Sequence, residues 1–214
     1  MKHLIVVAHP SASSFTMALT RLYATELERL GHTQSMSDLY RMRFNPVLGV
    51  EELASADSAW VADFPARAAP TDVARAQEQV READVLTVVY PLWWLSMPAI
   101  MKGYIDRVFA RGFAYEAAHG IVSGLLTGKK CVLITLSGAP FTVLAQDGRW
   151  SAVQALQDTQ IFRSAGFELL EHLHLDQVQP NLSISAAEHH FARILDCVRR
   201  HFSAPAVAAA QATG

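Results

Sequence analysis

The chain has 214 residues, the size of one domain with a substantial hydrophobic core. Its composition, 51% hydrophobic and 18% charged, excludes a disordered or collagen-like chain. Eighteen basic residues against twenty acidic ones give a formal net charge of -2, and without a Lys/Arg run the sequence offers no electrostatic footprint for nucleic acid.

Short apolar segments alternate along the chain with longer segments of helical periodicity. The predicted strands are residues 4–8, 33–39, 85–90, 131–136 and the partly polar 168–175. The predicted helices are residues 15–30, 72–83, 98–109, 150–165 and 186–202. Strands that are apolar on both faces and separated by helices predict an α/β fold, a doubly wound five-stranded parallel sheet of order 2-1-3-4-5 with helices on both faces.

The remaining segments place limits on the domain organisation. Residues 41–71 contain prolines and no clear period, so we expect an excursion over the surface. Residues 1–203 are predicted to form a single domain, and residues 204–214 a flexible tail. No apolar run is long enough to span a bilayer or to form a signal peptide. Because Cys131 and Cys197 form no CxxC or metal-ligand pattern, we expect a cytoplasmic protein without a metal site.

In a doubly wound sheet, ligands bind beyond the carboxyl ends of the strands, where the winding reverses. This rule selects three loops before any motif is considered: residues 9–16, 91–97 and 137–141. We call them the first, second and third loops.

The first loop carries hydroxyl side chains in place of the glycines of a GxGxxG or Walker motif. Ser11, Ser13, Ser14 and Thr16 lie where a helix begins, so free backbone N–H groups, the helix dipole and O–H donors converge there. This combination suits a phosphate. The alternative is that one serine only caps the helix and that His9 is a structural histidine at a strand end.

The second loop places Trp93 and Trp94 between Pro91 and Pro98. Two flat apolar rings on a path fixed by prolines are typical of a wall that holds a planar ligand. A pair of core or dimer-interface tryptophans is the alternative.

The third loop combines the hydroxyl of Ser137 with Gly138, whose missing side chain lets backbone N–H groups approach a ligand closely. A simple turn is the alternative. Phosphate donors, an aromatic wall and an N–H cradle together on the three selected loops fit a flavin better than any other common ligand.

Four segments at these positions carry a family resemblance. They are PLWWLSMPAIMKGYIDRVFARGFAY (residues 91–115), AHPSASSF (8–15), SDLYRMRFNP (37–46) and ITLSG (134–138). With them, the sequence resembles the NAD(P)H:quinone oxidoreductase family of flavodoxin-like flavoproteins over roughly residues 3 to 200. The segment at 37–46 brings the chain closer to the FAD-binding quinone reductases than to the shorter FMN relatives.

The resemblance implies specific roles for residues of this sequence. The implied flavin-binding residues are His9, Ser14, Phe15, Thr16 and Met17 on the phosphate side, Pro91, Leu92, Trp93, Trp94 and Leu95 beside the isoalloxazine, and Thr135, Leu136, Ser137 and Gly138 at its polar edge. Thr16 stands where asparagine is common in the family. Trp94 and Tyr115 are the implied acceptor-binding residues, with Tyr115 reaching the pocket of the other subunit of a homodimer.

The chain departs from the mammalian enzymes of that family at the group that stabilises the reduced flavin. Where those enzymes have a tyrosine and a histidine, counting along this chain gives Val143 and Arg149. Arg149 can supply a fixed cation beside the anionic flavin, or it can be only a loop charge. Ser137, Gly138 and Arg149 are therefore the candidate catalytic residues.

The resulting prediction is a flavin-dependent NAD(P)H:quinone oxidoreductase that passes a hydride from NAD(P)H to flavin N5 and then to a quinone-like acceptor in two steps. FAD is the expected cofactor, with FMN as the alternative. Two other functions stay open: an FMN-dependent azoreductase or nitroreductase, and a redox-sensing ancillary subunit of a transport protein.

Overall fold

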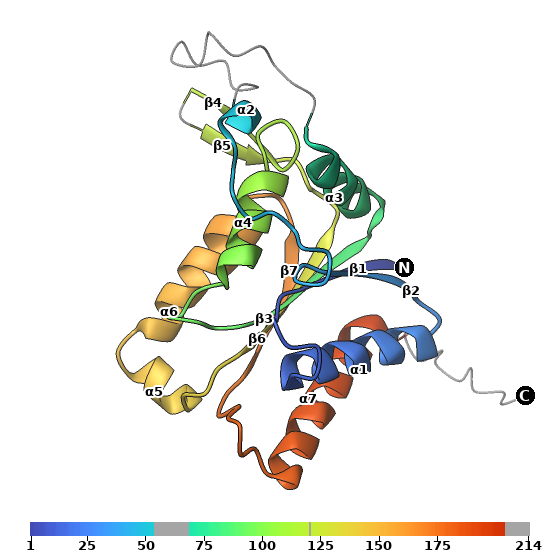
Figure 1. The fold of residues 1–214 in the computed structure, drawn as a ribbon, viewed down its shortest axis with the longest axis vertical. Helices are drawn as coiled ribbons and strands as arrows, with labels where there is room; N and C mark the ends of the chain where they lie inside the picture. The colour runs from blue at the N-terminus through green and yellow to red at the C-terminus, as the bar shows by residue number, and fades with distance from the viewer. Residues whose placement is uncertain (54–68, 120, 204–214) are drawn as a thin grey trace, which may run out of the picture.

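A five-stranded parallel sheet forms the centre of the protein (Figure 1). The computed structural model describes residues 1–53, 69–119 and 121–203. The strands, in spatial order, are β2 (Thr33–Asp38), β1 (Lys2–Val7), β3 (Val85–Pro91), β6 (Lys130–Leu136) and β7 (Glu168–Leu175). With the hairpin strands β4 and β5 left out of the count, this is the predicted order 2-1-3-4-5, and the predicted fold is confirmed.

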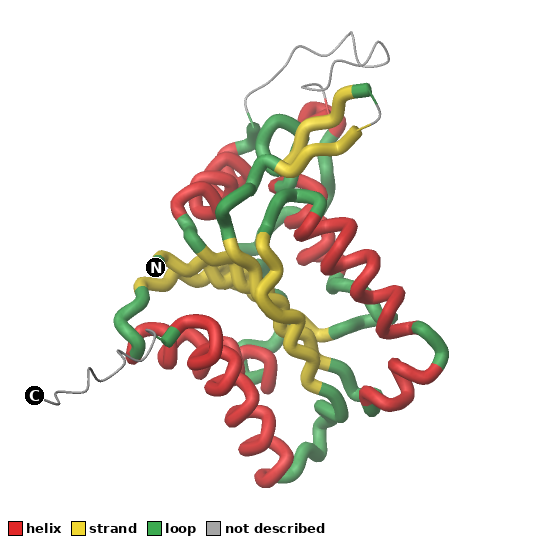
Figure 2. Tube along the Cα trace, turned by 180° about the vertical axis from the view of Figure 1, so that it is seen from behind, coloured by secondary structure: helices red, strands yellow, loops and turns green. Residues whose placement is uncertain are grey.

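Helices cover both faces of the sheet (Figure 2). The helices α1 (Phe15–Arg29) and α7 (Ile184–Phe202) pack on one face, where residues such as Leu19 and Ile194 are fully buried against Ile5 and Ile134. The other face is covered by α3 (Thr71–Glu82), α4 (Ala99–Val108), α6 (Arg149–Gln154) and the π-helix η1 (Ala155–Arg163). Because both faces are buried, the central strands β1, β3 and β6 read as nearly continuous apolar runs, whereas the edge strands β2 and β7 carry polar residues.

Several elements did not follow from periodicity. A two-stranded antiparallel hairpin, β4 (Tyr115–Ala118) and β5 (Ile121–Gly124), lies between α4 and β6. Short helices occur at α2 (Val50–Leu53) and α5 (Phe141–Gln146). The predicted helix over 150–165 is divided into α6 and the wider η1, whose hydrogen bonds run from residue i to i+5. Each of these elements is short or irregular, so its sequence carries little periodic signal.

The beginning of the predicted excursion is fixed to α4 by a buried cation. The Arg107 guanidinium donates to Glu52 at 2.9 and 3.0 Å, to the Asn45 carbonyl at 2.7 Å and to Asp72 at 2.6 Å. A side chain on Gly103 would overlap the Pro46 carbonyl oxygen, so a glycine is required where this segment crosses α4. The end of segment 37–46 is therefore packed against α4.

Two further predictions concern membrane-spanning segments and the C-terminal tail. No helix among the described residues is long and apolar enough to cross a membrane. The predicted tail, residues 204–214, lies outside the described residues.

Candidate flavin site

The three loops selected by the topology meet at the carboxyl edge of β1, β3 and β6. The Ala8 N–H donates to the Val89 carbonyl at 3.0 Å, which joins the first loop to β3. The Leu92 N–H donates to the Leu136 carbonyl at 2.7 Å, which joins the second loop to the end of β6, where the third loop begins. Main-chain hydrogen bonds between neighbouring parallel strands thus set the spacing of the site.

The first loop ends in a capped helix start without negative charge. The Oγ of Ser14 accepts from the Met17 N–H at 3.2 Å, and the first turn of α1 holds no acidic residue. His9 Nδ1 accepts from the Ser11 N–H at 3.1 Å, so the imidazole braces the loop. Thr16 and Met17 are both buried, and the Met17 N–H is already taken by the Ser14 cap. An anion beyond this turn would meet backbone donors and the positive end of the dipole.

The second loop is a strained two-residue turn. Trp93 and Ser96 exchange N–H···O bonds of 3.1 Å in both directions, and the two residues between them, Trp94 and Leu95, have φ of 53° and 60°. Left-handed φ at both central positions defines a type I′ turn, which usually contains Asn-Gly. A bulky residue in this region costs on the order of 1–3 kcal/mol and marks functional sites more often than chance. The turn leaves the Trp94 side chain 100% exposed in the single chain.

The third loop is bound to the strand beside it. The Oγ of Ser137 lies 2.9 Å from the Ala139 carbonyl and 3.0 Å from His174 Nε2. Gly138 is exposed, and a side chain there would meet no atom closer than 3.7 Å, so the space beside its backbone is open. Thr135 and Leu136 are buried, and the Thr135 hydroxyl contacts two histidines.

The other predicted residues are distributed less tightly. The His9 and Trp93 rings are 6.4 Å apart, whereas Tyr115 belongs to β4 at the opposite, amino end of the sheet (Figure 1). Within one chain, Tyr115 is thus separate from the three loops. Arg149 is 44% exposed and forms an ion pair with Asp147, with Nε to Oδ1 at 2.7 Å. Its charge is locally offset, and its role beside a flavin stays a prediction.

Sequence reasoning missed a buried polar chain behind the third loop. His172 Nδ1 lies 2.7 Å from Asp158 Oδ1, and Thr135 Oγ1 lies 2.8 Å from His172 Nε2 and 2.9 Å from His174 Nδ1. The two histidines alternate with leucine on β7, which puts both on one face of the strand. That i, i+2 spacing was the available signal.

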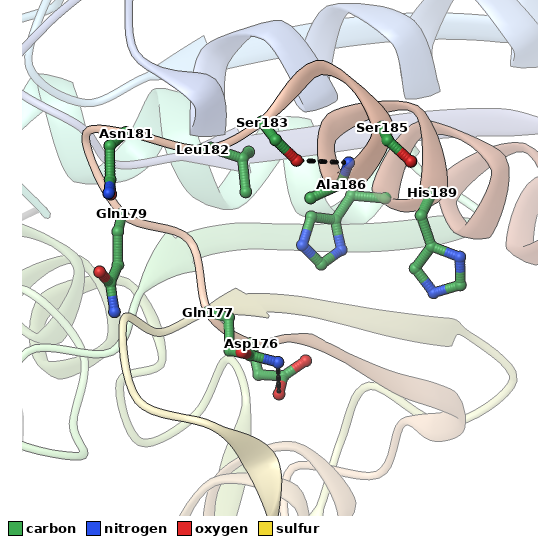
Figure 3. A pocket seen from close by; sticks show the side chains of 10 residues that line it. Asp176, Gln177, Gln179, Asn181, Leu182, Ser183, Ser185, Ala186 and His189 are labelled. Atoms are coloured by element: carbon green, nitrogen blue, oxygen red, sulfur yellow. Dashed lines mark hydrogen bonds between the residues drawn. The ribbon is translucent and has the colours of Figure 1, made fainter.

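A polar pocket of about 700 Å³ adjoins the edge at the start of α7 (Figure 3). Its wall includes Gln179, whose Nε2 donates to the Gly138 carbonyl at 3.0 Å, and Ser183, whose Oγ accepts from the Ala186 N–H at 3.2 Å. His190 also lines it, is only 5% exposed, and has an Nδ1 without a hydrogen-bond partner. The Phe15 ring lies 6.0 Å from that imidazole, so pocket and first loop are neighbours.

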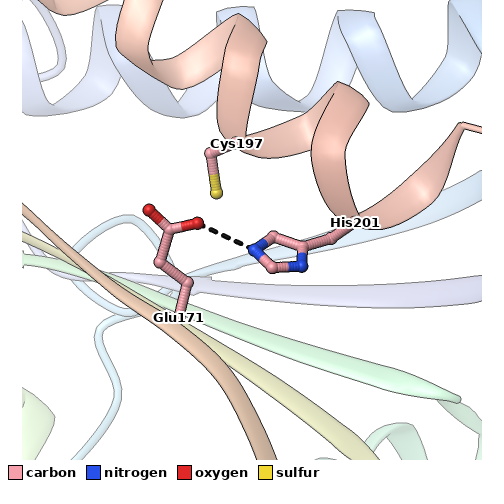
Figure 4. Close-up of side chains that lie close together, drawn as sticks. All are labelled: Glu171, Cys197 and His201. Carbon is pink, nitrogen blue, oxygen red and sulfur yellow. Dashed lines mark hydrogen bonds and ion pairs between the residues drawn. The ribbon is translucent and has the colours of Figure 1, made fainter.

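One group of three possible metal ligands occurs among the described residues (Figure 4). Glu171, Cys197 and His201 bring their ligand atoms within 4.8 Å of one another. His201 Nε2 and Arg200 already contact the same Glu171 oxygen, at 2.7 and 3.1 Å, and burial raises the pKa of the Cys197 thiol. A guanidinium on the carboxylate and a neutral thiol favour a brace between β7 and α7 over a metal site.

Fold and site together define an α/β protein of the doubly wound class with a candidate ligand site at the carboxyl edge. Residues 1–200 match the family described by its flavodoxin-like fold, and the chain belongs to that family.

Individual relatives support the resemblance seen in the sequence. The chain is 34% identical over 181 residues to an uncharacterized NAD(P)H oxidoreductase of Haemophilus influenzae, covering 82% of this chain and 86% of the relative. It is 35% identical over 156 residues to the ribosyldihydronicotinamide dehydrogenase (quinone) of Mus musculus, covering 69% and 68%. The solved NAD(P)H:quinone oxidoreductase from Methanothermobacter marburgensis superposes with a TM-score of 0.80 at 27% identity, over 93% of this chain and 98% of that one.

Proposed function

We propose that the protein binds a flavin at the carboxyl edge of the sheet and uses it to pass electrons from NAD(P)H to a quinone-like acceptor. The observation that carries the proposal is the meeting of an uncharged helix start, an exposed tryptophan turn and a glycine cradle on three hydrogen-bonded loops. Two relatives support the same activity: a dehydrogenase whose name gives a quinone as acceptor, and an NAD(P)H:quinone oxidoreductase.

The residues present fit a flavin in charge and shape. Ser14 and the backbone around Thr16 and Met17 would hold a phosphate, because the α1 start offers N–H donors and no carboxylate. Trp93, Trp94 and Leu95 would border the ring system, with Pro91 and Leu92 below them, and Ser137 and Gly138 would face its polar edge. The bound flavin supplies the hydride-accepting chemistry.

The pocket beside α7 supports FAD over FMN. An FMN ends at its single phosphate, whereas FAD carries a further nucleotide that needs a polar cleft continuous with the phosphate site. The pocket in Figure 3 adjoins both the first and third loops. His190 lines it, and the buried Nδ1 of that histidine has no hydrogen-bond partner. A buried polar atom without a partner is costly, so a ligand group that hydrogen bonds it would recover that free energy.

A homodimer completes the site in this proposal. The Trp94 side chain is fully exposed in the single chain. The β4–β5 hairpin, to which Tyr115 belongs, exposes Ile121 and Val122 as well. Apolar side chains exposed on a projecting element are typical of an interface. A two-fold partner would bring its Tyr115 to the acceptor side of the flavin and exclude water from the ring.

The chain's own contribution is binding, orientation and shielding. The type I′ turn presents the Trp94 side chain to solvent before any ligand arrives, so no rearrangement of the backbone is needed on binding. The two buried free thiols, Cys131 and Cys197, suit the reducing cytoplasm that we propose as its location.

Cofactor extraction and a substrate comparison test this function. We expect the purified protein to release FAD on denaturation, identified by mass, and to oxidise NAD(P)H faster with quinones than with azo dyes. Protein that takes up neither FAD nor FMN would contradict the flavin site. Faster azo-dye turnover would assign the azoreductase activity, and flavin binding with negligible turnover of either substrate would favour the ancillary redox-sensing role.

A further inference from the structure

The buried polar chain behind the third loop is continuous from one end to the other. It runs Asp158, His172, Thr135, His174, Ser137 and the Ala139 carbonyl, with each neighbouring pair of atoms 2.7–3.0 Å apart. All four ring nitrogens of the two histidines have a partner. The chain starts on η1, crosses β7 and β6, and ends in the third loop.

Two arrangements of this chain keep both histidine contacts of Thr135. In the first, both histidines are neutral and protonated at Nδ1: His172 donates to Asp158, Thr135 donates to His172, His174 donates to Thr135, and Ser137 donates to His174. The Ser137–Ala139 hydrogen bond is then not made, because the serine hydroxyl has only one proton.

In the second arrangement, His172 is a cation that donates from both nitrogens, to Asp158 and to Thr135. Thr135 then donates to His174 Nδ1, His174 donates from Nε2 to Ser137, and Ser137 donates to the Ala139 carbonyl. All five hydrogen bonds are made. The two arrangements differ by one proton, by the tautomer of His174 and by the direction of the Ser137 hydroxyl.

We propose that Asp158, His172, Thr135, His174 and Ser137 form a relay that takes up one proton when electrons arrive at the flavin edge. The proposal rests on the flavin site of the proposed function. The proton comes from solvent and resides on His172, no covalent bond to carbon forms or breaks, and the cation offsets the negative charge delivered with the hydride. Arg149 is a weaker candidate for that role, since Asp147 already offsets its charge.

The surroundings of the relay suit a single mobile proton. Asp158 and His172 are buried, so a cation on His172 is stable only as half of this ion pair. Burial, and then the neighbouring His172, lower the pKa of His174 to about 4, which keeps His174 neutral in both arrangements. The Trp150 ring lies 4.8 Å from each imidazole and packs against the relay.

Other charged or titratable groups around the relay come from each packed element. They are Asp176 at the end of β7, Arg193 on α7, Tyr90 on β3 and Cys131 on β6. Burial keeps Tyr90 and Cys131 neutral by raising their pKa. Asp176 and Arg193 act on His174 in opposite directions, so Asp158 is the decisive partner of the relay. A cavity of about 290 Å³ lined by Trp150, His172 and His174 gives the proton a route from solvent.

The first test uses the flavin-free protein and nitrogen NMR of the imidazoles across pH. We expect His172 to protonate while His174 stays neutral and moves its proton from Nδ1 to Nε2 with the same midpoint. Thr135→Val should abolish that tautomer change. Thr87→Val is the matched control, because Thr87 is an equally buried strand threonine that contacts Tyr23 outside the relay. A His174 tautomer that stays fixed through the His172 titration would overturn the relay.

The second test links the relay to reduction through the pH dependence of the flavin potential. One additional proton taken up on reduction changes the equilibrium tenfold per pH unit, about 30 mV for a two-electron couple. We expect Thr135→Val to remove this slope and Thr135→Ser, which keeps the hydroxyl, to retain it. Equal slopes in wild type and Thr135→Val would overturn the link to reduction. If the wild-type protein did not bind flavin, the proposed function would be contradicted instead. The NMR test of the relay would still be valid, because it uses the flavin-free protein.

Discussion

The exposed Trp94 ring offers the most specific prediction of the flavin site. A side chain that is 100% exposed contributes no packing to the single chain, so Trp94→Ala should change the free energy of unfolding of the flavin-free protein by no more than about 0.5 kcal/mol. Trp94→Asn should be neutral or slightly stabilising, because asparagine tolerates the left-handed φ of 53° better than tryptophan.

The effect on binding should be much larger. A tryptophan buries about 150–250 Å² when fully covered. If one face of the ring meets the flavin, roughly 100 Å² is lost on truncation, and at about 25 cal/mol per Å² this corresponds to about 2.5 kcal/mol. Since 1.4 kcal/mol is a factor of ten, both variants should weaken flavin binding by roughly 60-fold.

Fluorescence quenching of added flavin measures the dissociation constant, and thermal unfolding of the flavin-free protein measures the stability. Leu156→Ala is the control, because Leu156 is 64% exposed on η1 and belongs to none of the three loops. If flavin affinity is unchanged in both Trp94 variants, the Trp94 ring does not contact the flavin. If the same variants dissociate the dimer in ultracentrifugation, Trp94 belongs to the interface instead.

Three further predictions concern the first loop, Arg149 and acid stability. Ser14→Ala and Ser183→Ala each remove a helix cap and should each lower the free energy of unfolding by about 1 kcal/mol. Only Ser14→Ala should weaken FMN binding, and an FMN affinity equal in the two variants would show that Ser14 does not belong to the phosphate site. Arg149→Ala should change the rate of flavin reduction by no more than about twofold, because Asp147 offsets the charge of the guanidinium and both groups are solvated. If stopped-flow absorbance shows a reduction rate that is several-fold lower in the variant, Arg149 is the counter-charge of the reduced flavin. Burial lowers the pKa of His3 and His174 in the folded protein from 6.5 to about 4, so the unfolded chain binds more protons between these values and the free energy of unfolding should fall as the pH decreases from 7 towards 4. Denaturant titrations at pH 7 and pH 5 should give free energies of unfolding that differ by on the order of 1–2 kcal/mol for each histidine. Equal free energies of unfolding at the two pH values would contradict the burial of neutral histidines.

The architecture was predictable because its signals are local. Strands such as 85–90 and 131–136 are unbroken apolar runs, and each neighbouring helix has its own period. The carboxyl-edge rule then located the loops without any contact information. Pro98 and Pro140 directly precede α4 and α5, which shows how strongly a fixed φ marks the start of a helix.

The parts that were missed depend on contacts far apart in the sequence or on strain. Nothing in Trp94-Leu95 signals a type I′ turn, since neither residue favours left-handed φ, and the turn is closed by the paired main-chain hydrogen bonds between Trp93 and Ser96. The relay joins Thr135 to His172 across 37 residues, and its geometry requires the wide η1 helix to present Asp158 inward. The predicted roles of Tyr115 and of the homodimer likewise depend on a second chain.

The central claim is that electrons pass from NAD(P)H through a bound flavin to a quinone, and anaerobic visible absorbance of the flavin-loaded protein tests it most directly. We expect one equivalent of NAD(P)H to bleach the flavin band and one equivalent of a quinone to restore it. A band that NAD(P)H does not bleach, or that stays bleached when the quinone is added, would contradict the account.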